Sequence, residues 1–364
     1  MIGVVITVYN SADVLLECVE SLLASTGPEV RLVLVDNASP DESVARLEAW
    51  AGGTLPFVPD PASPLGPGRP VPKPVALQRC EAAGAADLAR TPLAPVTVVR
   101  APRNLGYAGG VNLGLSVLAA RDDLALMWVL NPDCVVPPGT PAALLRAQAA
   151  AGDFSIMGSR LVYYSTPDRI HADGGRVRPW SGICESVNRG APVATTPLPD
   201  PAGLDFVIGA NMVVGRAFLD RTGPMLEDYF LYYEEVDWAL RRNGLPLALA
   251  PGAEVYHHGG SAIGTGRLDA RPSAFANYFN YRNRMRFVRR FRPGRLPAAY
   301  ALNLARIGKS AFRDDAARTA GAFRGLHGLA PPPEVAARVG PEAAACAFGR
   351  AVRYAPPGKI GTSG

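Results

Sequence analysis

The chain has 364 residues, 48% of them hydrophobic, and a formal net charge of +5 at pH 7. This apolar content supplies a substantial core, so we expect one large domain or two ordinary ones that fold without disulfides. The five cysteines lack CxxC spacing, which argues against a zinc finger or a disulfide framework. No apolar run approaches the roughly 20 residues of a membrane span, and no secretory leader is recognised, so we expect a cytoplasmic protein.

Short apolar runs alternate with helical patterns in the first part of the chain. In order, the sequence predicts strand 3–8, helix 12–23, strand 31–35, helix 42–50, strand 96–100, helix 110–120 and strand 124–130. This alternation is typical of an α/β fold, with a Rossmann-like, mainly parallel sheet flanked by helices. Residues 52–95 are rich in Pro, Gly and Ala, which predicts a long mobile insertion without regular elements.

The second half is less regular. The sequence predicts strand 205–215, helix 234–243, strand 253–257, helices 274–291 and 296–312, and further helices within 333–352. We divide the chain into a sheet domain at 1–265, basic helices at 266–318 and an Ala/Pro-rich tail at 319–364, in which we find no functional signal.

Polar residues follow four of the predicted strands. They are Asn10, then Asp36 and Asn37, then Arg103 and Asn104, then Asn131 and Asp133. Each group alone is an ordinary turn or helix cap. Because the carboxyl ends of parallel strands form one ligand-binding edge, we expect all four groups to meet in one crevice.

Each task in binding a nucleotide has a candidate there. Asp36 is suited to accept the imide N–H of a pyrimidine, and the glycine-rich stretch 103–114 is suited to approach a ligand closely at a helix start. That stretch does not match GxGxxG, and tight helix packing is an alternative role for its glycines. Asp133 in the LNPD turn is placed to hold Mg or Mn on two phosphate oxygens.

A second group of acids lies in FLYYEEVDWALRR, residues 230–242. Glu234, Glu235 and Asp237 among aromatic side chains resemble a half-buried general base with a raised pKa. Acids also stabilise a helix start, and Asp237 is spaced to pair with Arg241, so structural roles stay open. In VYHHGGSA, residues 255–262, metal or phosphate contact by histidine competes with an ordinary loop.

Many cations gather in one segment of the predicted basic helices. They are Arg282, Arg284, Arg286, Arg289, Arg290, Arg292 and Arg295. This cluster predicts contact with anionic lipid at the inner face of a membrane or with a charged acceptor, the alternative being a solvated helix face. Nucleic-acid binding is not favoured, because no reader motif is present.

Taken in order, the segments 6–10, 35–41, 104–114, 130–133, 233–238 and 255–260 resemble the family 2 glycosyltransferases with the GT-A fold, closest to a rhamnosyltransferase-like branch. The resemblance covers roughly residues 1–292. It implies a GT-A catalytic domain at 1–265 with a mixed acceptor-side region, C-terminal helices and an inverting, metal-dependent transfer of sugar.

The resemblance also implies roles for individual residues. The donor site would consist of Thr7, Tyr9, Asn10, Asp36, Asn37, Arg103, Asn104, Gly106, Gly109, Asn112 and Asn131. Asp133 and His257 would hold the divalent metal, Mg or Mn. Glu235 would take the acceptor proton, with Glu234 and Asp237 as alternatives for this base.

The sequence predicts classes of donor and acceptor, and not single compounds. A dTDP-rhamnose-like donor is the first expectation and a UDP-sugar the second; the acceptor is a hydroxyl of a glycan, a lipid-linked glycan or a natural product, as in cell-envelope polysaccharide assembly. A sugar nucleotidyltransferase is one alternative, but it usually begins with a glycine-rich, Arg-containing loop, where this chain has VYNSADV. A non-catalytic nucleotide-sugar binding protein of the same fold is the other.

Overall fold

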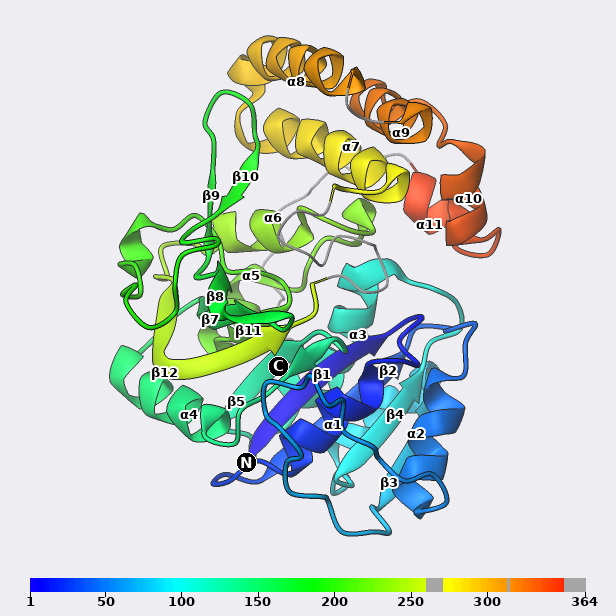
Figure 1. Ribbon diagram of the computed structural model, residues 1–364, viewed down its shortest axis with the longest axis vertical. Helices are drawn as coiled ribbons and strands as arrows, with labels where there is room; N and C mark the ends of the chain where they lie inside the picture. Colours follow the sequence, from blue (N-terminus) through cyan, green and yellow to red (C-terminus); the bar gives the residue numbers. More distant parts are fainter. Residues whose placement is uncertain (260–270, 313–314, 350–364) are drawn as a thin grey trace, which may run out of the picture.

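A computed structural model describes residues 1–259, 271–312 and 315–349 (Figure 1). The strands are β1 (Ile2–Val8), β2 (Val30–Asp36), β3 (Leu77–Glu81), β4 (Val96–Arg100), β5 (Leu126–Leu130), β6 (Cys134–Val135), β7 (Ile156–Tyr163), β8 (Thr166–Ala172), β9 (Gly175–Val177), β10 (Cys184–Ser186), β11 (Asn211–Val214) and β12 (Ala248–His257).

The helices follow the same numbering. They are α1 (Leu15–Leu23), α2 (Ser43–Gly52), η1 (Ala82–Ala89), α3 (Gly106–Ala119), α4 (Thr140–Ala151), η2 (Pro201–Gly203), α5 (Arg216–Thr222), η3 (Glu227–Tyr229), α6 (Glu234–Leu240), α7 (Ala274–Phe291), η4 (Pro293–Arg295), α8 (Leu296–Ala311), α9 (Ala316–His327), α10 (Pro333–Val339) and α11 (Ala344–Phe348).

One large sheet organises the molecule, with the strand order β3-β4-β2-β1-β5-β11-β7-β12-β6 and β8 paired to β7. The strands from β3 to β5 are all parallel, whereas β11 runs antiparallel to β5 and to β7. The predicted α/β class, a mainly parallel sheet flanked by helices with a mixed second part, is therefore confirmed.

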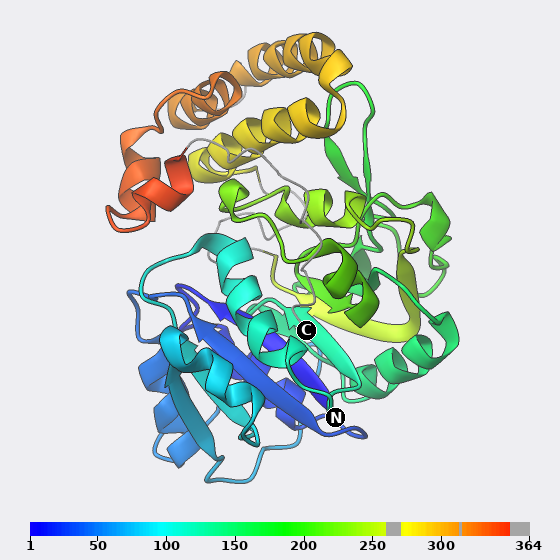
Figure 2. The same cartoon turned by 180° about the vertical axis from the view of Figure 1, so that it is seen from behind.

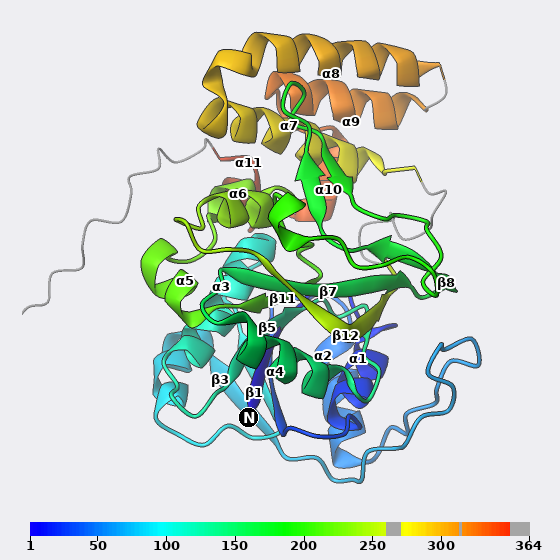
Figure 3. The ribbon, with the colours of Figure 1, turned by 90° about the vertical axis from the view of Figure 1, so that its left-hand side faces the viewer.

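Helices cover both faces of this sheet because the strands are apolar on both sides. Helices α1, α2 and α4 pack on one face, where Trp50 and Trp128 are fully buried. Helices α3, α5 and α6 pack on the other face, and their core continues to residues of α7, α8 and α9 (Figure 2). Figure 3 shows α7, α8 and α9 as a further layer beyond the sheet.

The segment 52–95 corrects one prediction, because it contains β3 and η1. A composition rich in Pro and Gly disfavours long helices, but it does not prevent an edge strand, and β3 pairs in parallel with β4. Buried Glu20 anchors the preceding loop by accepting hydrogen bonds from Val71 N at 2.7 Å and Trp50 Nε1 at 2.8 Å. Lys73 lies 3.1 Å from the centroid of the Trp50 ring.

The arginine cluster is the second correction, since it is neither one lipid-facing surface nor one solvated face. Arg282 and Arg284 are buried, and among the seven only Arg289 is exposed. The side chain of Arg282 donates to the carbonyls of Tyr229 and Ala347, and Arg286 donates to the carbonyl of Gly349. These guanidinium groups donate to backbone carbonyls at the end of α11 and in η3, which fixes α11 against α7.

Several element ends differ from the predictions. Helix α3 begins at Gly106 rather than at residue 110, and the strand predicted at 205–215 is limited to β11. In the described ranges, no helix combines the length and the apolar character needed to cross a bilayer. The 265/266 boundary, the residues Gly260 to Ala262 of the histidine motif and the end of the tail from residue 350 lie outside the described residues.

Candidate functional site

A pocket opens at the carboxyl ends of the parallel strands. Residues that follow the strands line it together with residues of the later helices; they are Thr7, Tyr9, Ser11, Asn37, Asn104, Gly106, Tyr107, Asn131, Pro132, Asp133, Phe230, Leu231, Phe275, Arg338 and Val339. Three of the four predicted polar groups therefore contribute lining residues. The first, Asn10, is exposed outside the lining, although its neighbours Tyr9 and Ser11 belong to it.

Asn37 and Asn104 shape this pocket through the turn before α3. The Asn37 amide donates to Asn104 Oδ1 at 3.1 Å and to Gly106 O at 3.0 Å, and its Oδ1 accepts from Leu105 N at 2.9 Å. Asn104 Oδ1 also accepts from Gly106 N at 2.9 Å. Both side chains thus hold the glycine-rich turn in place. The sequence had predicted only contacts with the nucleotide donor for these two residues.

The glycines of α3 divide between two roles. Gly106 lines the pocket with φ +74°, and a Cβ there would lie 2.5 Å from Phe230 O, so only glycine fits without a shift. Gly109 lies outside the lining, and a Cβ on it would meet Leu105 Cβ at 2.6 Å. A Cβ on Gly110 would meet Thr7 at 2.4 Å, so this glycine allows α3 to pack closely on β1.

Four further predicted donor residues also lie outside the lining. Asn112 instead joins α3 to η3, since its amide donates to Met225 O and to Glu227 Oε1, both at 2.9 Å. Asn10 N donates to Ser39 Oγ at 2.8 Å, Asp36 Oδ1 accepts from Ser39 N at 2.9 Å, and Arg103 is exposed. The sequence could not reveal the contacts of Asn112, because its partners lie more than a hundred residues away.

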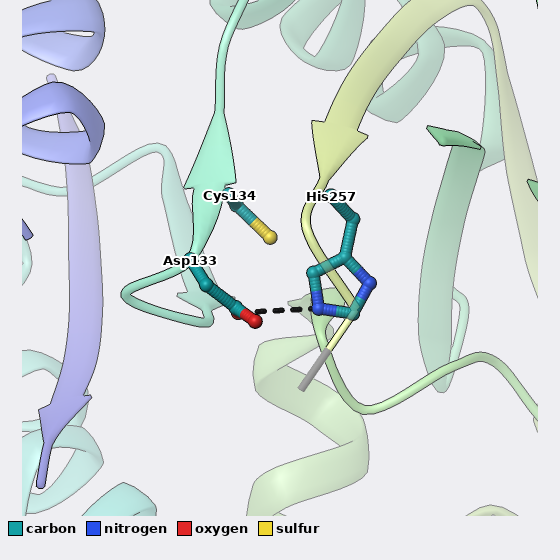
Figure 4. A group of neighbouring side chains, drawn as sticks. All are labelled: Asp133, Cys134 and His257. Atoms are coloured by element: carbon teal, nitrogen blue, oxygen red, sulfur yellow. Dashed lines mark ion pairs between the residues drawn. The ribbon is translucent and has the colours of Figure 1, made fainter. Parts of the chain in front are cut away.

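Asp133 and His257 form a buried pair at the pocket (Figure 4). His257 Nε2 lies 3.2 Å from Asp133 Oδ1. The strand register creates this pair, because β6 and β12 run antiparallel with His257 opposite Cys134. The Cys134 thiol lies in the same group, with its sulfur within 4.8 Å of both other candidate ligand atoms. Sequence spacing had given no sign of this cysteine, since the cluster forms only through strand pairing.

His171 on β8 contacts the far side of the His257 ring. The Nδ1 atoms of the two rings are 3.2 Å apart, and the rings stack with centroids 5.0 Å apart. Tyr163 stacks on the other face of His171 at 4.4 Å. Burial, with smaller electrostatic contributions from His257 and Arg189, lowers the pKa of His171 to about 3, so its ring is neutral at pH 7. No motif in the sequence pointed to His171.

The acids of α6 separate into two kinds. Asp237 is fully buried and ion-paired with Arg241 at 2.7 Å and Arg290 at 2.6 Å, and it accepts a hydrogen bond from Tyr229 OH. These partners are those of a structural ion pair, the alternative that the sequence left open for Asp237. The pair with Arg241 is the i, i+4 pair that the sequence predicted.

Glu234 and Glu235 lie in a different environment. Their Oε2 atoms are buried and have no hydrogen-bond partner among the described residues. Burial, and for Glu234 also the negative charge of Glu235, raises the pKa of both carboxyls, that of Glu235 to about 7. A carboxyl of this kind exchanges protons near neutral pH, as a general base must.

Tyr107 lies near both these acids and Asp133. It lines the pocket, its hydroxyl donates to Gly209 O, and the side chain of Glu235 lies beside Gly209. Burial and the nearby carboxylates of Glu234, Glu235 and Asp133 raise its pKa. The acids therefore do not line the pocket themselves, but they lie directly behind one of its walls.

Comparison with known proteins gives one family match, since residues 3–58 match the model described as Glycosyl transferase family 2. A search of curated proteins finds no match.

Solved structures with a related arrangement include GalNAc-T7 with UDP, GalNAc and Mn2+, at 16% identity and a TM-score of 0.47, where the match covers 70% of this chain and 43% of that one. S. aureus TarS 1-349 with UDP-GlcNAc matches at 12% identity and 0.47, covering 89% and 79%. A mannosyltransferase from Pyrobaculum calidifontis with GDP-Man and Mn2+ matches at 15% and 0.45, covering 90% and 79%. The chain thus spans less than half the length of the first of these structures.

Proposed function

We propose that this protein is a glycosyltransferase that moves a sugar from a nucleoside-diphosphate sugar to an acceptor hydroxyl. The observation that carries the proposal is the pocket in which Asn37, Asn104 and Asp133 meet from the ends of three parallel strands, with Glu234 and Glu235, whose Oε2 atoms have no hydrogen-bond partner among the described residues, close to Tyr107. The family match over β1, α1, β2 and α2 supports it, because it covers the strand ends that form one side of this pocket.

For the donor we propose a pyrimidine nucleotide, dTDP-rhamnose-like or a UDP-sugar. Asp36 ends β2 at the same sheet edge as the pocket, and a carboxylate at this place is suited to accept the N3–H of uracil or thymine. A purine offers a different pattern of hydrogen-bond donors and acceptors. Substitution of Asp36 should therefore alter which nucleobase the protein prefers.

The pair of Asp133 and His257 fits a divalent metal. Two ligands at right angles around an ion, each about 2.1 Å away, would lie about 3 Å apart, and the observed separation is 3.2 Å. A carboxylate suits Mg or Mn, and a buried imidazole is a common further ligand. Such an ion would supply positive charge to the departing diphosphate.

For the reaction we propose a single displacement with inversion. Glu235 accepts the proton of the acceptor hydroxyl, whose oxygen bonds to the anomeric carbon while the bond from that carbon to the diphosphate oxygen breaks. The pKa of about 7 supports Glu235, because about half of this carboxyl is then ionised at neutral pH. Glu234 stays the alternative base, because its Oε2 atom is also buried without a hydrogen-bond partner among the described residues.

Calorimetric titration with UDP, dTDP and GDP, with and without Mn2+, tests the proposal. We expect binding of a pyrimidine diphosphate that strengthens with Mn2+ and loses this dependence in Asp133→Asn. Asp123→Asn is a matched control, because Asp123 pairs with Arg121 away from the pocket. Wild-type protein that binds no nucleotide, with or without metal, would overturn the proposed function.

A further inference from the structure

The C-terminal helices contribute directly to the pocket. Phe275 at the start of α7 and Arg338 and Val339 at the end of α10 line it opposite the strand ends. Figure 1 shows α10 and α11 at one end of the helical layer, close to the start of α3, and Cys346 Sγ lies 3.6 Å from Leu105 O. A segment that reads as an Ala/Pro-rich tail thus closes one side of the candidate donor site.

Packing holds α10 in this position. Val335 and Val339 are buried in one apolar cluster with Phe230 and Phe279. Phe230 is shared with the glycine-rich turn, because its carbonyl accepts a hydrogen bond from Tyr107 N at 2.8 Å. The same aromatic residue therefore supports both the turn before α3 and the helix that bears Arg338.

The charges in the pocket are few. Of the lining residues that the structure describes, only Asp133 and Arg338 carry a charged side chain. The guanidinium carbon of Arg338 lies 4.9 Å from the centroid of the Phe275 ring, a contact that limits the conformations of the side chain. Its side chain is exposed, so a ligand in the pocket can reach it.

We propose that Arg338 binds the diphosphate of the nucleotide donor. This inference rests on the proposed function and adds a binding residue from α10 to it. A nucleoside diphosphate brings at least two negative charges next to Asp133, and a planar guanidinium offers two parallel N–H donors to phosphate oxygens. Arg338 is the cation of the described pocket that offsets this repulsion.

The test compares a nucleoside with its diphosphate in the absence of metal. Titrations of UDP and uridine, or dTDP and thymidine, are carried out in EDTA with wild type, Arg338→Met and Arg338→Lys. Methionine keeps an aliphatic chain over Phe275, so the packing of α10 is preserved. Arg146→Met on α4 is the matched control, because Arg146 is also exposed but lies outside the pocket.

We expect Arg338→Met to weaken diphosphate binding roughly 10- to 100-fold while nucleoside binding changes less than about twofold. Lysine should restore part of the affinity, since it keeps the charge but not the paired donors. Equal loss for nucleoside and diphosphate would show a structural role and overturn the inference, as would unchanged diphosphate binding. Wild-type protein without affinity for any nucleotide, even with Mn2+, would overturn the proposed function itself.

Discussion

The two sides of the pocket are built in different ways. On the strand side, short turns after parallel strands supply Asn37, Asn104 and Asp133, and hydrogen bonds between these turns fix their shape. On the helix side, apolar packing of α7 and α10 brings Phe275 and Arg338 to the opening. The strand side therefore follows from a rule of sheet topology, whereas the helix side depends on which helices pack together.

The largest expected effect is at the candidate base, Glu235 on α6, which belongs to neither lining. Glu235→Gln should lower kcat for sugar transfer by about 10²- to 10⁴-fold, because no carboxylate is then present to take the proton from the hydroxyl of the acceptor substrate. Donor affinity should change little. Glu234→Gln is the matched control, and a larger loss of kcat in that variant would move the role of base to Glu234.

The same carboxyl should set the pH dependence. The pKa of Glu235 is raised to about 7, and a base acts in its deprotonated form, so kcat/KM should rise with pH through about 7 instead of through the range of an ordinary glutamate. A pH profile of initial rates measures this limb. If kcat/KM of Glu235→Gln still rises with pH near 7, a group other than Glu235 causes this rise.

On the strand side, Asp133→Asn should weaken Mn2+ binding by at least about 100-fold, because an amide lacks the charge that the ion requires. Electron paramagnetic resonance of free Mn2+ measures this affinity without any need for turnover. Asp36→Asn is the comparison, since it should alter the preference for the base and leave Mn2+ binding intact. Unchanged Mn2+ affinity in Asp133→Asn would exclude this aspartate as a ligand.

A smaller effect is expected behind the metal pair. His171→Phe keeps a ring between Tyr163 and His257 but removes the nitrogen 3.2 Å from His257 Nδ1, so Mn2+ affinity should fall about 10-fold. Tyr163→Phe preserves the stacked ring and serves as the control. If both variants bind Mn2+ like wild type, His171 does not position His257.

The smallest expected effect is on stability. Folding raises the pKa of Glu234 above that of the unfolded chain, so the unfolded state loses its proton first as the pH rises. The contribution of the Glu234 carboxyl to stability is present at low pH. It decreases as the pH rises above about 4.5, the pKa of this carboxyl in the unfolded chain. Glu234→Gln should therefore raise Tm relative to wild type by roughly 2–4 °C at pH 8, and not at pH 4. An equal difference at both pH values would contradict this origin.

Motifs at strand ends supplied several residues of the pocket lining, although Asn10, Asp36 and Arg103 of the same motifs lie outside it. The carboxyl ends of parallel strands meet at one edge whatever the details of packing, so Asn37, Asn104, Asn131 and Asp133 could be assigned to one crevice in advance. Gly109 and Asn112 were predicted to bind the donor but lie further along α3, away from this edge. There Gly109 allows close packing against Leu105, and Asn112 contacts the loop at Met225.

Tertiary structure alone decided the use of the charged residues. Arg282 and Arg284 resemble surface cations in the sequence, yet both are buried: Arg282 donates to the carbonyl of Tyr229, and Arg284 donates to the Tyr233 hydroxyl and to Asn303 Oδ1. Asp237 and Glu235 stand two positions apart in one acidic motif, but only Asp237 faces arginines. Sequence periodicity predicted the central parallel strands β1, β2, β4 and β5, several helices and the edge where ligands bind, because these depend on local patterns of apolar residues; β3 and β6 to β10 had no predicted counterpart. The partners of each charge were decided by contacts between distant segments, which no local pattern records.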